Sequence, residues 1–292
     1  MIYCALMGGL GNQLFQIFAT ISYGLQHGQS FAFPKKDYLI RVDRPTYWQS
    51  FLVKLQPYLV EKLPDISFSE NGFEYNAFPL VECNLQVECN FPMCIEGYFQ
   101  SELYFKPHFS EICEMIGLGQ FQTECLLKYP DYNNMISMHF RIGDYADITD
   151  CHPIMPIQYY KNALQHILSV SEQTHDVLYF CEEKDNECAL QMISQLQSEL
   201  QFSHVKFDKA PEVAAWEQMI MMSICKHHII ANSTFSWWGA YFHRNLQNVG
   251  VYSGQYVNSC QYVCYPDKWF GHLLSHKNIK DLHPKEWTVI TL

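Results

Sequence analysis

The stretch MISMHFRIGDY (Met135–Tyr145) joins an apolar run to a cluster of functional side chains. The run is short, apolar on both faces and poor in charge, which predicts a buried β-strand over 135–140. His139, Arg141 and Asp144 follow within six residues. Buried groups of these types need partners, and ligands of open α/β sheets bind at the carboxyl ends of strands. The stretch predicts either a site for an anionic substrate or an Arg–Asp pair that braces a turn.

Short apolar segments alternate with helical patterns through the C-terminal half. This alternation predicts right-handed βαβ units and a parallel sheet, which is an α/β fold. The expected strands are 135–140, 177–181, 204–207, 228–231 and 249–252, and the expected helices are 156–170, 186–200, 212–226 and 234–243.

A glycine loop, GGLGNQ (Gly8–Gln13), follows a first strand expected at 2–7 and precedes a helix expected at 14–26. Such a loop points backbone N–H groups at an anion or lets a ligand approach the backbone closely. A dinucleotide fingerprint needs a third glycine where Leu14 stands, and an acidic residue at the end of the next strand. Both are missing, so a dinucleotide-binding oxidoreductase is an alternative that the loop does not favour.

The middle of the chain has poor periodicity, with one strand expected at 95–100 and a helix from Pro107 to about 116. The polar, turn-rich segment KYPDYNN (128–134) predicts a boundary. We therefore expect an N-terminal α/β half at 1–130 and a C-terminal half at 131–292.

Composition and charge exclude several classes of partner. The net charge is −11, which argues against nucleic acid and membrane-surface binding. No basic leader and no apolar run of about 18 residues is present, so we expect a cytoplasmic chain without an integral membrane segment, able to act at a membrane that carries glycan precursors. The 12 cysteines are scattered without Cys-x-x-Cys, which favours reduced thiols over zinc or disulfides.

A second informative stretch, IIANSTFSWWGA (Ile229–Ala240), leads from an apolar strand into a helix. Asn232 or Ser233 is a natural N-cap. Together with Thr234 and Ser236, the first turn of the helix could bind an anion or a ribose. We expect Trp237 and Trp238 to pack the helix onto the sheet.

Four stretches together resemble the α-1,2-fucosyltransferases of glycosyltransferase family 11. They are GGLGNQLFQ (8–16), GYFQSE (97–102), His139-x-Arg141-x-Gly143-Asp144-Tyr145 and CKHHIIANSTFSWWGA (225–240). They occur in order over nearly the whole chain, and the last one is long enough to be specific.

The resemblance implies a GT-B-like enzyme, with two Rossmann-type halves whose parallel sheets face a cleft. It implies GDP-L-fucose as donor, bound mainly by the C-terminal half, and an oligosaccharide or glycoconjugate acceptor with the Gly-rich half on the acceptor side. The implied reaction is inverting and makes an α-1,2 linkage on a galactosyl 2-hydroxyl. The implied donor-binding residues are Gly9, Gly11, Asn12, His139, Arg141, Asn232, Ser233, Thr234 and Ser236.

The chain departs from the family pattern at two places. Ile142 stands where a second arginine is common, and Cys181-Glu182-Glu183 stands where Ser-Asp-Asp is commoner. Ile142 would remove a secondary contact to the phosphates. The change at Cys181–Glu183 would alter the nucleotide contacts made from the end of the strand expected at 177–181.

The chemistry of glycosyl transfer assigns roles to these residues. A fixed guanidinium from Arg141 would stabilise the charge that develops on the leaving diphosphate. No Asp-x-Asp occurs, so we expect no metal and no cofactor. The acceptor hydroxyl needs a proton acceptor, or a group that orients it. Asp144 and His139 are the candidates, with Glu217 and Asn12 behind them, and the sequence does not choose among them.

Other interpretations of the same motifs remain open. A protein O-fucosyltransferase or an α-1,6 enzyme would share the His-x-Arg element, and a non-catalytic protein that binds nucleotide sugars would fit the two departures. The acceptor, the oligomeric state and the biological role are not specified by the sequence.

Overall fold

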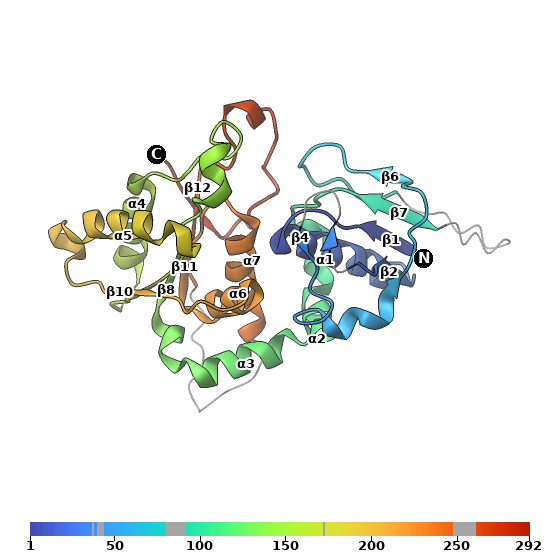
Figure 1. Cartoon of the computed structure of the whole chain (residues 1–292), viewed down its shortest axis with the longest axis horizontal. Coiled ribbons are helices and arrows are strands. Elements are labelled where there is room, and N and C mark those ends of the chain that lie inside the picture. The colour runs from blue at the N-terminus through green and yellow to red at the C-terminus, as the bar shows by residue number, and fades with distance from the viewer. Residues whose placement is uncertain (37, 40–43, 80–91, 172, 248–260) are drawn as a thin grey trace. The chain divides into compact units, whose positions relative to one another are not determined.

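The computed structural model describes residues 1–36, 38–39, 44–79, 92–171, 173–247 and 261–292 (Figure 1). These residues divide into two compact units. The first unit contains Met1–Leu118 and Asn278–Pro284, and the second contains Gly119–Lys277 and Lys285–Leu292. The division expected after residue 130 falls within the second unit, and the roles expected for the two halves stay predictions.

The first unit is built on a five-stranded sheet with all strands parallel, in the order β5-β2-β1-β7-β6. Its strands are β1 (Ile2–Ala5), β2 (Phe31–Pro34), β5 (Leu59–Val60), β6 (Phe68–Ser69) and β7 (Met93–Glu96). The main helices are α1 (Leu10–Gln26) and α2 (Phe109–Ile116), and β3 (Tyr38–Leu39) pairs antiparallel with β4 (Arg44–Pro45). Helix α1 is buried along most of its length because its apolar residues recur at helical spacing.

The second unit contains a six-stranded parallel sheet in the order β10-β9-β8-β11-β12-β13. Counted along the chain, this order is 3-2-1-4-5-6, the order of doubly wound dinucleotide-binding folds. Its strands are β8 (Ile136–His139), β9 (Val177–Phe180), β10 (Phe207–Lys209), β11 (His227–Ile229), β12 (Val263–Pro266) and β13 (Thr288–Ile290). Its helices are α3 (Leu118–Lys128), α4 (Ile157–Val170), α5 (Asn186–Gln197), α6 (Ala215–Ile224) and α7 (Thr234–Phe242).

Short 3-10 helices connect these elements. They are η1 (Val53–Tyr58), η2 (Glu102–Tyr104), η3 (Lys106–His108), η4 (Pro130–Asn134), η5 (Gly143–Asp147), η6 (Glu183–Asp185), η7 (Leu200–Phe202), η8 (His243–Gln247) and η9 (His272–Leu274).

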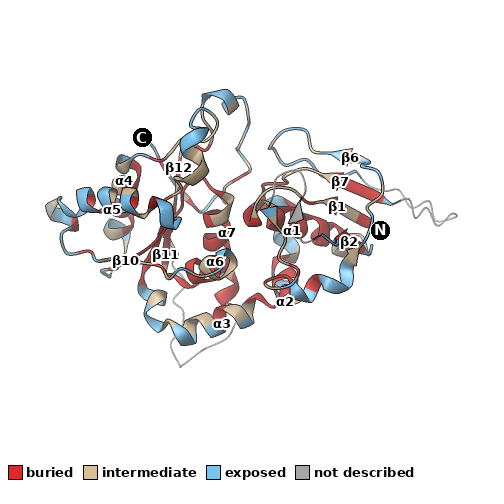
Figure 2. Cartoon of the chain, in the orientation of Figure 1, coloured by how far each residue is buried: buried red, intermediate tan, exposed pale blue. Residues whose placement is uncertain are grey.

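Burial follows the sheets (Figure 2). Strands β8 and β9 are buried at every position, and the last seven residues of α7 are buried as well. Trp237 and Trp238 are fully buried, and Trp237 stacks on Tyr241, so the predicted packing of both indoles is confirmed. Helix α5 has an exposed outer face in Figure 2.

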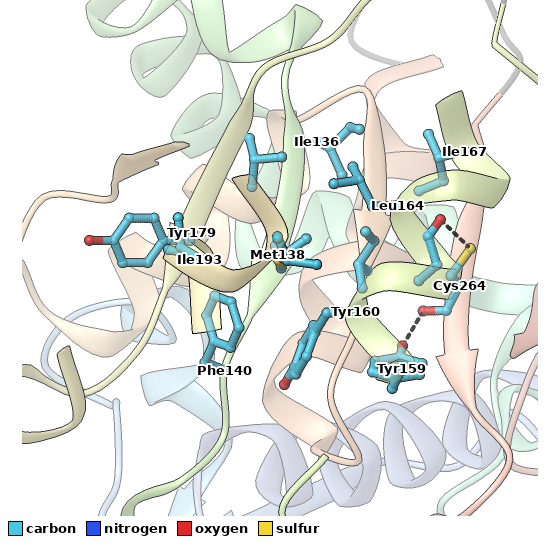
Figure 3. Packing of buried hydrophobic residues seen from close by; sticks show 14 of the residues in the cluster. Ile136, Met138, Phe140, Tyr159, Tyr160, Leu164, Ile167, Tyr179, Ile193 and Cys264 are labelled. Carbon is cyan, nitrogen blue, oxygen red and sulfur yellow. Dashed lines mark hydrogen bonds between the residues drawn. The ribbon is translucent and has the colours of Figure 1, made fainter. Parts of the chain in front are cut away.

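Two tyrosines at the start of α4 connect the core to the ends of the strands (Figure 3). The Tyr159 hydroxyl donates to the Ile230 carbonyl at 2.5 Å and to the Cys264 carbonyl at 3.1 Å. The Tyr160 hydroxyl donates to the His139 carbonyl at 3.1 Å. Both rings are buried, so these bonds fix the carboxyl ends of β8 and β11 and tie α4 to Cys264 within β12.

The predicted α/β class, with a parallel sheet in each of two Rossmann-type units, is confirmed. Several details differ from the sequence prediction. Helix α1 begins at Leu10, so Gly11, Asn12 and Gln13 are helical and not part of a loop. The strand expected at 204–207 lies at 207–209, and β12 and β13 were not predicted. The strand expected at 249–252 lies outside the described residues, and the predicted cleft stays a prediction.

Candidate functional site

The second sheet has its topological switch point between β8 and β11. These neighbouring strands pair in parallel, with Ile136 opposite His227 and Met138 opposite Ile229. The connection after β8 continues toward β9 on one side, and the connection after β11 continues toward β12 on the other. The loops therefore separate at this point, which is where open α/β sheets bind ligands. Both sequence motifs of this unit begin here, His139–Tyr145 after β8 and Asn232–Ser236 after β11.

Arg141 lies at the carboxyl end of β8, between two carboxylates. Its guanidinium donates to Asp144 at 2.5 Å and to Glu182 at 2.7 Å. The Arg141 side chain is 20% exposed, while Asp144 and Glu182 are nearly half exposed. Its Nε is buried and has no hydrogen-bond partner. The planar fork is therefore fixed by two acids and keeps one buried donor unsatisfied, which suits the binding of an oxyanion.

The turn after Arg141 is stabilised from the end of β9. The Gly143 N–H donates to the buried Asp185 carboxylate at 2.6 Å. Gly143 has a φ of +32°, and a Cβ at this position would approach the Glu182 carboxylate to 2.9 Å. Glycine is needed here on both grounds. The Glu182 carboxylate thus lies directly against both Gly143 and the Arg141 guanidinium.

His139 ends β8 as a neutral, buried imidazole. Burial, and to a smaller extent the Arg141 charge, lowers the pKa of His139 to about 3. Its Nδ1 is buried without a hydrogen-bond partner, and its ring lies 5.7 Å from the Phe235 ring. A histidine with so low a pKa is a poor proton acceptor near pH 7. The free, buried Nδ1 of His139 therefore suits a hydrogen bond with a ligand better than the removal of a proton from the acceptor hydroxyl.

The segment after β11 joins the same site. Ser233 is the N-cap of α7, because its hydroxyl accepts from the Phe235 N–H. Asn232 is buried and plays a different part, since its Nδ2 donates to the carbonyls of Pro153 and Trp269, at 3.0 and 3.1 Å. Asn232 Oδ1 is buried without a partner. Of the two candidate caps, Ser233 is therefore the one that the helix uses.

The other two hydroxyls of this segment differ in exposure. Ser236 is buried and its hydroxyl donates to the Ser233 carbonyl at 3.3 Å, so it serves the first turn of α7. Thr234 is half-buried. The structure thus places Ser233, Thr234 and Ser236 together on the first turn, as their spacing predicts.

Tyr145 connects the two motifs. Its hydroxyl donates to the Asn232 carbonyl at 3.1 Å, and the Arg141 guanidinium lies over its ring at 5.0 Å. The His152 ring stacks on the Tyr145 ring at 4.8 Å with an interplanar angle of 23°. Arg141, Asp144, Tyr145, His152 and Asn232 are therefore one connected cluster, and His139 precedes it at the end of β8.

The first unit brings polar side chains together at the carboxyl ends of β1 and β7, which pair in parallel. Asn12 follows β1 and Gln100 follows β7, and the Gln100 amide donates to Asn12 Oδ1 at 3.0 Å. Gly8 has a φ of +77° and its position is crowded by the Asn12 side chain, so glycine is needed there. Gly9 caps α1 and Gly11 lies in its first turn.

Two buried glutamines hold the glycine segment. Gln16 accepts from the Met7 N–H at 2.8 Å and donates to the Met7 carbonyl at 3.0 Å. Gln13 donates to the carbonyls of Gly8 and Pro45. The glutamines of the motif GGLGNQLFQ thus fix the backbone that presents Asn12.

A carboxylate supports the segment that carries Gln100. Glu70 accepts from the Tyr98 N–H at 2.7 Å and from the Phe99 N–H at 3.0 and 3.1 Å. Phe99 has a φ of +51°, a rare conformation for an aromatic residue. Burial raises the pKa of Glu70. Sequence reasoning missed Glu70, because it is far along the chain from the motif that it supports.

Glu217, a secondary candidate for the base, caps α6 by accepting the Ala214 N–H at 3.0 Å. Within the described ranges, no group of three or more His, Cys, Asp and Glu residues could hold a metal ion. In that same part of the chain, no helix is long and apolar enough to cross a membrane.

Four buried polar atoms near the switch point have no hydrogen-bond partner: His139 Nδ1, Arg141 Nε, His152 Nδ1 and Asn232 Oδ1. Unsatisfied buried atoms each cost about 1–3 kcal/mol, so a cluster of them indicates a ligand site. Sequence reasoning found three of these residues and missed His152. The signal available for His152 was only its position shortly after the His139–Tyr145 motif.

Comparisons with known proteins identify the family of the chain. The family model described as glycosyl transferase family 11 matches residues 63–259. An α-1,2-colitosyltransferase of Escherichia coli is 24% identical over 268 residues, covering 82% of this chain and 87% of that protein. The O-antigen biosynthesis glycosyltransferase WbnK of Escherichia coli is 28% identical over 205 residues, covering 65% of this chain and 59% of that protein.

Among solved structures, the NodZ α-1,6-fucosyltransferase co-crystallised with GDP has a TM-score of 0.43 and 12% identity, covering 82% of this chain and 91% of that one. With its family model spanning well over half of its residues, this chain belongs to glycosyl transferase family 11.

Proposed function

We propose that this glycosyltransferase is an inverting enzyme that moves L-fucose from GDP-β-L-fucose to the 2-hydroxyl of a galactosyl acceptor, making an α-1,2 linkage. The observation that carries the proposal is the cluster around Arg141 at the switch point of the second sheet, in a member of family 11. A fixed guanidinium and several unsatisfied buried polar atoms suit the diphosphate of a sugar nucleotide. The donor would bind through His139, Arg141, Asn232, Ser233, Thr234 and Ser236.

The proposed reaction breaks the bond between the fucosyl C1 and the β-phosphate oxygen, and the electron pair leaves with GDP. The acceptor 2-hydroxyl oxygen forms the new bond to C1 from the opposite face, so the β-linked donor gives an α-linked product. Charge grows on the leaving oxygen while the ring becomes oxocarbenium-like. Arg141 would stabilise that charge, and Asp144 would keep the guanidinium oriented through its 2.5 Å hydrogen bond.

The acceptor hydroxyl must lose its proton during the transfer. Asp144 is the better of the two first candidates, because its carboxylate is nearly half exposed while His139 is buried and neutral. In the first unit, Asn12 and Gln100 are amides that can orient a hydroxyl without accepting its proton. We assign Asn12, Gly9 and Gly11 to the positioning of substrates at the carboxyl ends of β1 and β7.

A second donor is supported by one of the relatives. The Escherichia coli protein that covers most of this chain is an α-1,2-colitosyltransferase. Colitose is L-fucose without its 3-hydroxyl group, so the same diphosphate site could serve both sugars. Colitose is therefore the second candidate for the transferred sugar, with the same α-1,2 linkage.

The proposal places the enzyme in the cytoplasm, acting on glycans or glycan precursors. The nine cysteines that the described segments contain are all free thiols, which suits a reducing compartment. A membrane that carries the acceptor would then be met from its cytoplasmic side.

The test is a matrix of donors and acceptors. Purified protein is incubated with GDP-fucose, GDP-colitose or UDP-galactose and with lactose, N-acetyllactosamine, other galactosides or free fucose, and products are assigned by NMR. An α-1,2-fucosylated galactoside supports the proposal, and faster transfer of colitose selects the second donor. Another linkage, such as α-1,6, refutes the α-1,2 assignment. Binding of GDP without hydrolysis or transfer of any sugar would identify a non-catalytic protein.

A further inference from the structure

The segment that carries His152 is fastened at the switch point of the second sheet by its backbone. The Asn232 amide donates to the Pro153 carbonyl at 3.0 Å, directly after His152. The Gly271 N–H donates to the Cys151 carbonyl at 2.8 Å, directly before it. The His152 N–H itself donates to the Ile148 carbonyl at 2.9 Å. The backbone on both sides of His152 is therefore fixed relative to the end of β11.

The His152 ring is held as firmly as its backbone. It stacks on the Tyr145 ring at 4.8 Å and lies 5.6 Å from the Phe270 ring. Tyr145 is itself fixed, because its hydroxyl donates to the Asn232 carbonyl. The Arg141 guanidinium contacts the same tyrosine ring at 5.0 Å. Tyr145 thus orients both a guanidinium and an imidazole at one site.

One polar atom of this fixed ring lacks a partner. His152 Nδ1 is buried and makes no hydrogen bond. The same is true of three other atoms around these strand ends, His139 Nδ1, Arg141 Nε and Asn232 Oδ1. Burial lowers the pKa of His152, so the ring is neutral near pH 7 and offers a hydrogen bond and not a charge. A neutral imidazole can carry its proton on Nδ1 when an anionic oxygen faces that atom.

We propose that His152 is a further binding residue for the sugar nucleotide and that its Nδ1–H donates to an oxygen of the diphosphate. The inference rests on the proposed function, because it takes the ligand of the Arg141 cluster to be a sugar nucleotide. It adds a residue outside the four motifs that carry the family resemblance. His152 would supply a second donor in a chain whose Ile142 replaces the family's second arginine.

Calorimetric titration tests this with GDP, with GDP-fucose and, as a probe without phosphates, with guanosine. The variant His152→Phe keeps a ring on Tyr145 but has no nitrogen, and His152→Asn places an amide N–H near the former Nδ1. We expect His152→Phe to bind GDP about tenfold or more weakly, the loss typical of a hydrogen bond to a charged group, with guanosine binding unchanged. His152→Asn should recover part of the loss. His204→Phe, at an exposed histidine of the same unit, is the control and should bind GDP like the wild type.

The outcomes separate the two proposals. If the wild type binds GDP and His152→Phe binds it equally well, the role of His152 is overturned while the proposed function stands. A loss of affinity only for GDP-fucose would move the contact to the sugar and overturn the diphosphate assignment. Equal losses for GDP and guanosine, with a lower unfolding temperature of the unliganded variant, would mean a structural role. A wild type that does not bind GDP would overturn the proposed function and this inference together.

Discussion

The Arg141 guanidinium donates a 2.5 Å hydrogen bond to the Asp144 carboxylate, three residues along the chain. A second bond joins it to Glu182 at 2.7 Å, from the end of the neighbouring strand β9. The fork is thus oriented before any ligand binds, and its charge is compensated by two acids. A diphosphate that takes both terminal nitrogens of the fork would replace at least one of these carboxylates, most simply the one from Glu182, since Asp144 is on the same turn.

Replacing Arg141 by lysine should reduce kcat strongly. Lysine keeps the positive charge but cannot bridge Asp144 and an oxyanion with a planar fork. Loss of one such donor typically lowers turnover about 10²–10³-fold. The measurement is the initial rate of transfer from labelled GDP-fucose to a galactoside at saturating donor.

Arg244→Lys is the matched control for this variant. Arg244 also pairs with a glutamate, Glu286, but lies in η8 outside the cluster. The turnover of Arg244→Lys should remain within about twofold of the wild type, because Arg244 lies outside the cluster around Arg141. Wild-type kinetics for Arg141→Lys would remove Arg141 from the phosphate site.

Replacing Glu182 by glutamine should tighten GDP binding. The substitution removes one carboxylate that competes with the diphosphate for Arg141. Exposed ion pairs are worth about 0.2–1 kcal/mol, so the gain should be about two- to fivefold and should shrink at high salt. Calorimetric titration of GDP at two salt concentrations measures it. Glu199→Gln, whose partner is Lys161, is the control, and weaker GDP binding by Glu182→Gln would contradict the competition.

Metal removal should leave activity nearly unchanged. The sequence contains no Asp-x-Asp, and the resemblance assigns the diphosphate to Arg141 and to helix N-termini. Transfer rates measured with and without EDTA should therefore agree within error. Full loss of transfer, restored by Mn²⁺, would show that a metal takes part.

Local patterns predicted the fold class and the position of the site. The alternation of apolar strands and helices specifies parallel βαβ units, and the two motifs after β8 and β11 follow buried strands. The structure brings His139–Tyr145 and Asn232–Ser236 together because β8 and β11 are neighbours and the carboxyl ends of neighbouring parallel strands meet at one edge. Strands β12 and β13 escaped prediction because the long connection between them contains only the short 3-10 helix η9, and so gives no βαβ pattern.

Contacts that depend on strand register could not be predicted. Glu182 reaches Arg141 only because β8 and β9 pair with His139 opposite Phe180. Glu70 supports Phe99 only because β6 and β7 lie side by side. His152 lies on a loop without periodicity, and its position depends on the Asn232 amide. Side-chain contacts across strands and loops carry no local signal in the sequence.

Replacing Glu70 by glutamine should destabilise the first unit and lower turnover. The carboxylate accepts the N–H groups of Tyr98 and Phe99 with both oxygens, whereas an amide has only one acceptor oxygen. The turn at Phe99, whose φ is +51°, would then be less firmly held. Because Gln100 follows this turn, its hydrogen bond to Asn12 would be weakened as well. We expect a loss of about 1–2 kcal/mol in the free energy of unfolding, measured by urea titration.

The control for Glu70 is Glu61→Gln in the same unit. Glu61 is 78% exposed and pairs with Lys35 on the surface, so its loss should change the unfolding free energy by less than about 0.5 kcal/mol. If Glu70→Gln unfolds like the wild type and keeps its turnover, the turn at Phe99 is held by other contacts.

Replacing the buried His227 by asparagine should make stability less sensitive to acid. Burial lowers the pKa of His227 to about 3, so the native ring stays neutral while the unfolded chain takes up a proton below about pH 6.5. The contribution of the neutral His227 ring to the free energy of unfolding is fully present above pH 6.5 and is lost as the pH falls toward 3. Asparagine does not titrate, and its Oδ1 can accept the Tyr262 N–H that His227 Nδ1 now accepts. The decrease in unfolding free energy between pH 6.5 and 4.5, measured by urea titration, should be about 1–3 kcal/mol smaller than in the wild type. An unchanged decrease would mean that His227 does not contribute to acid sensitivity.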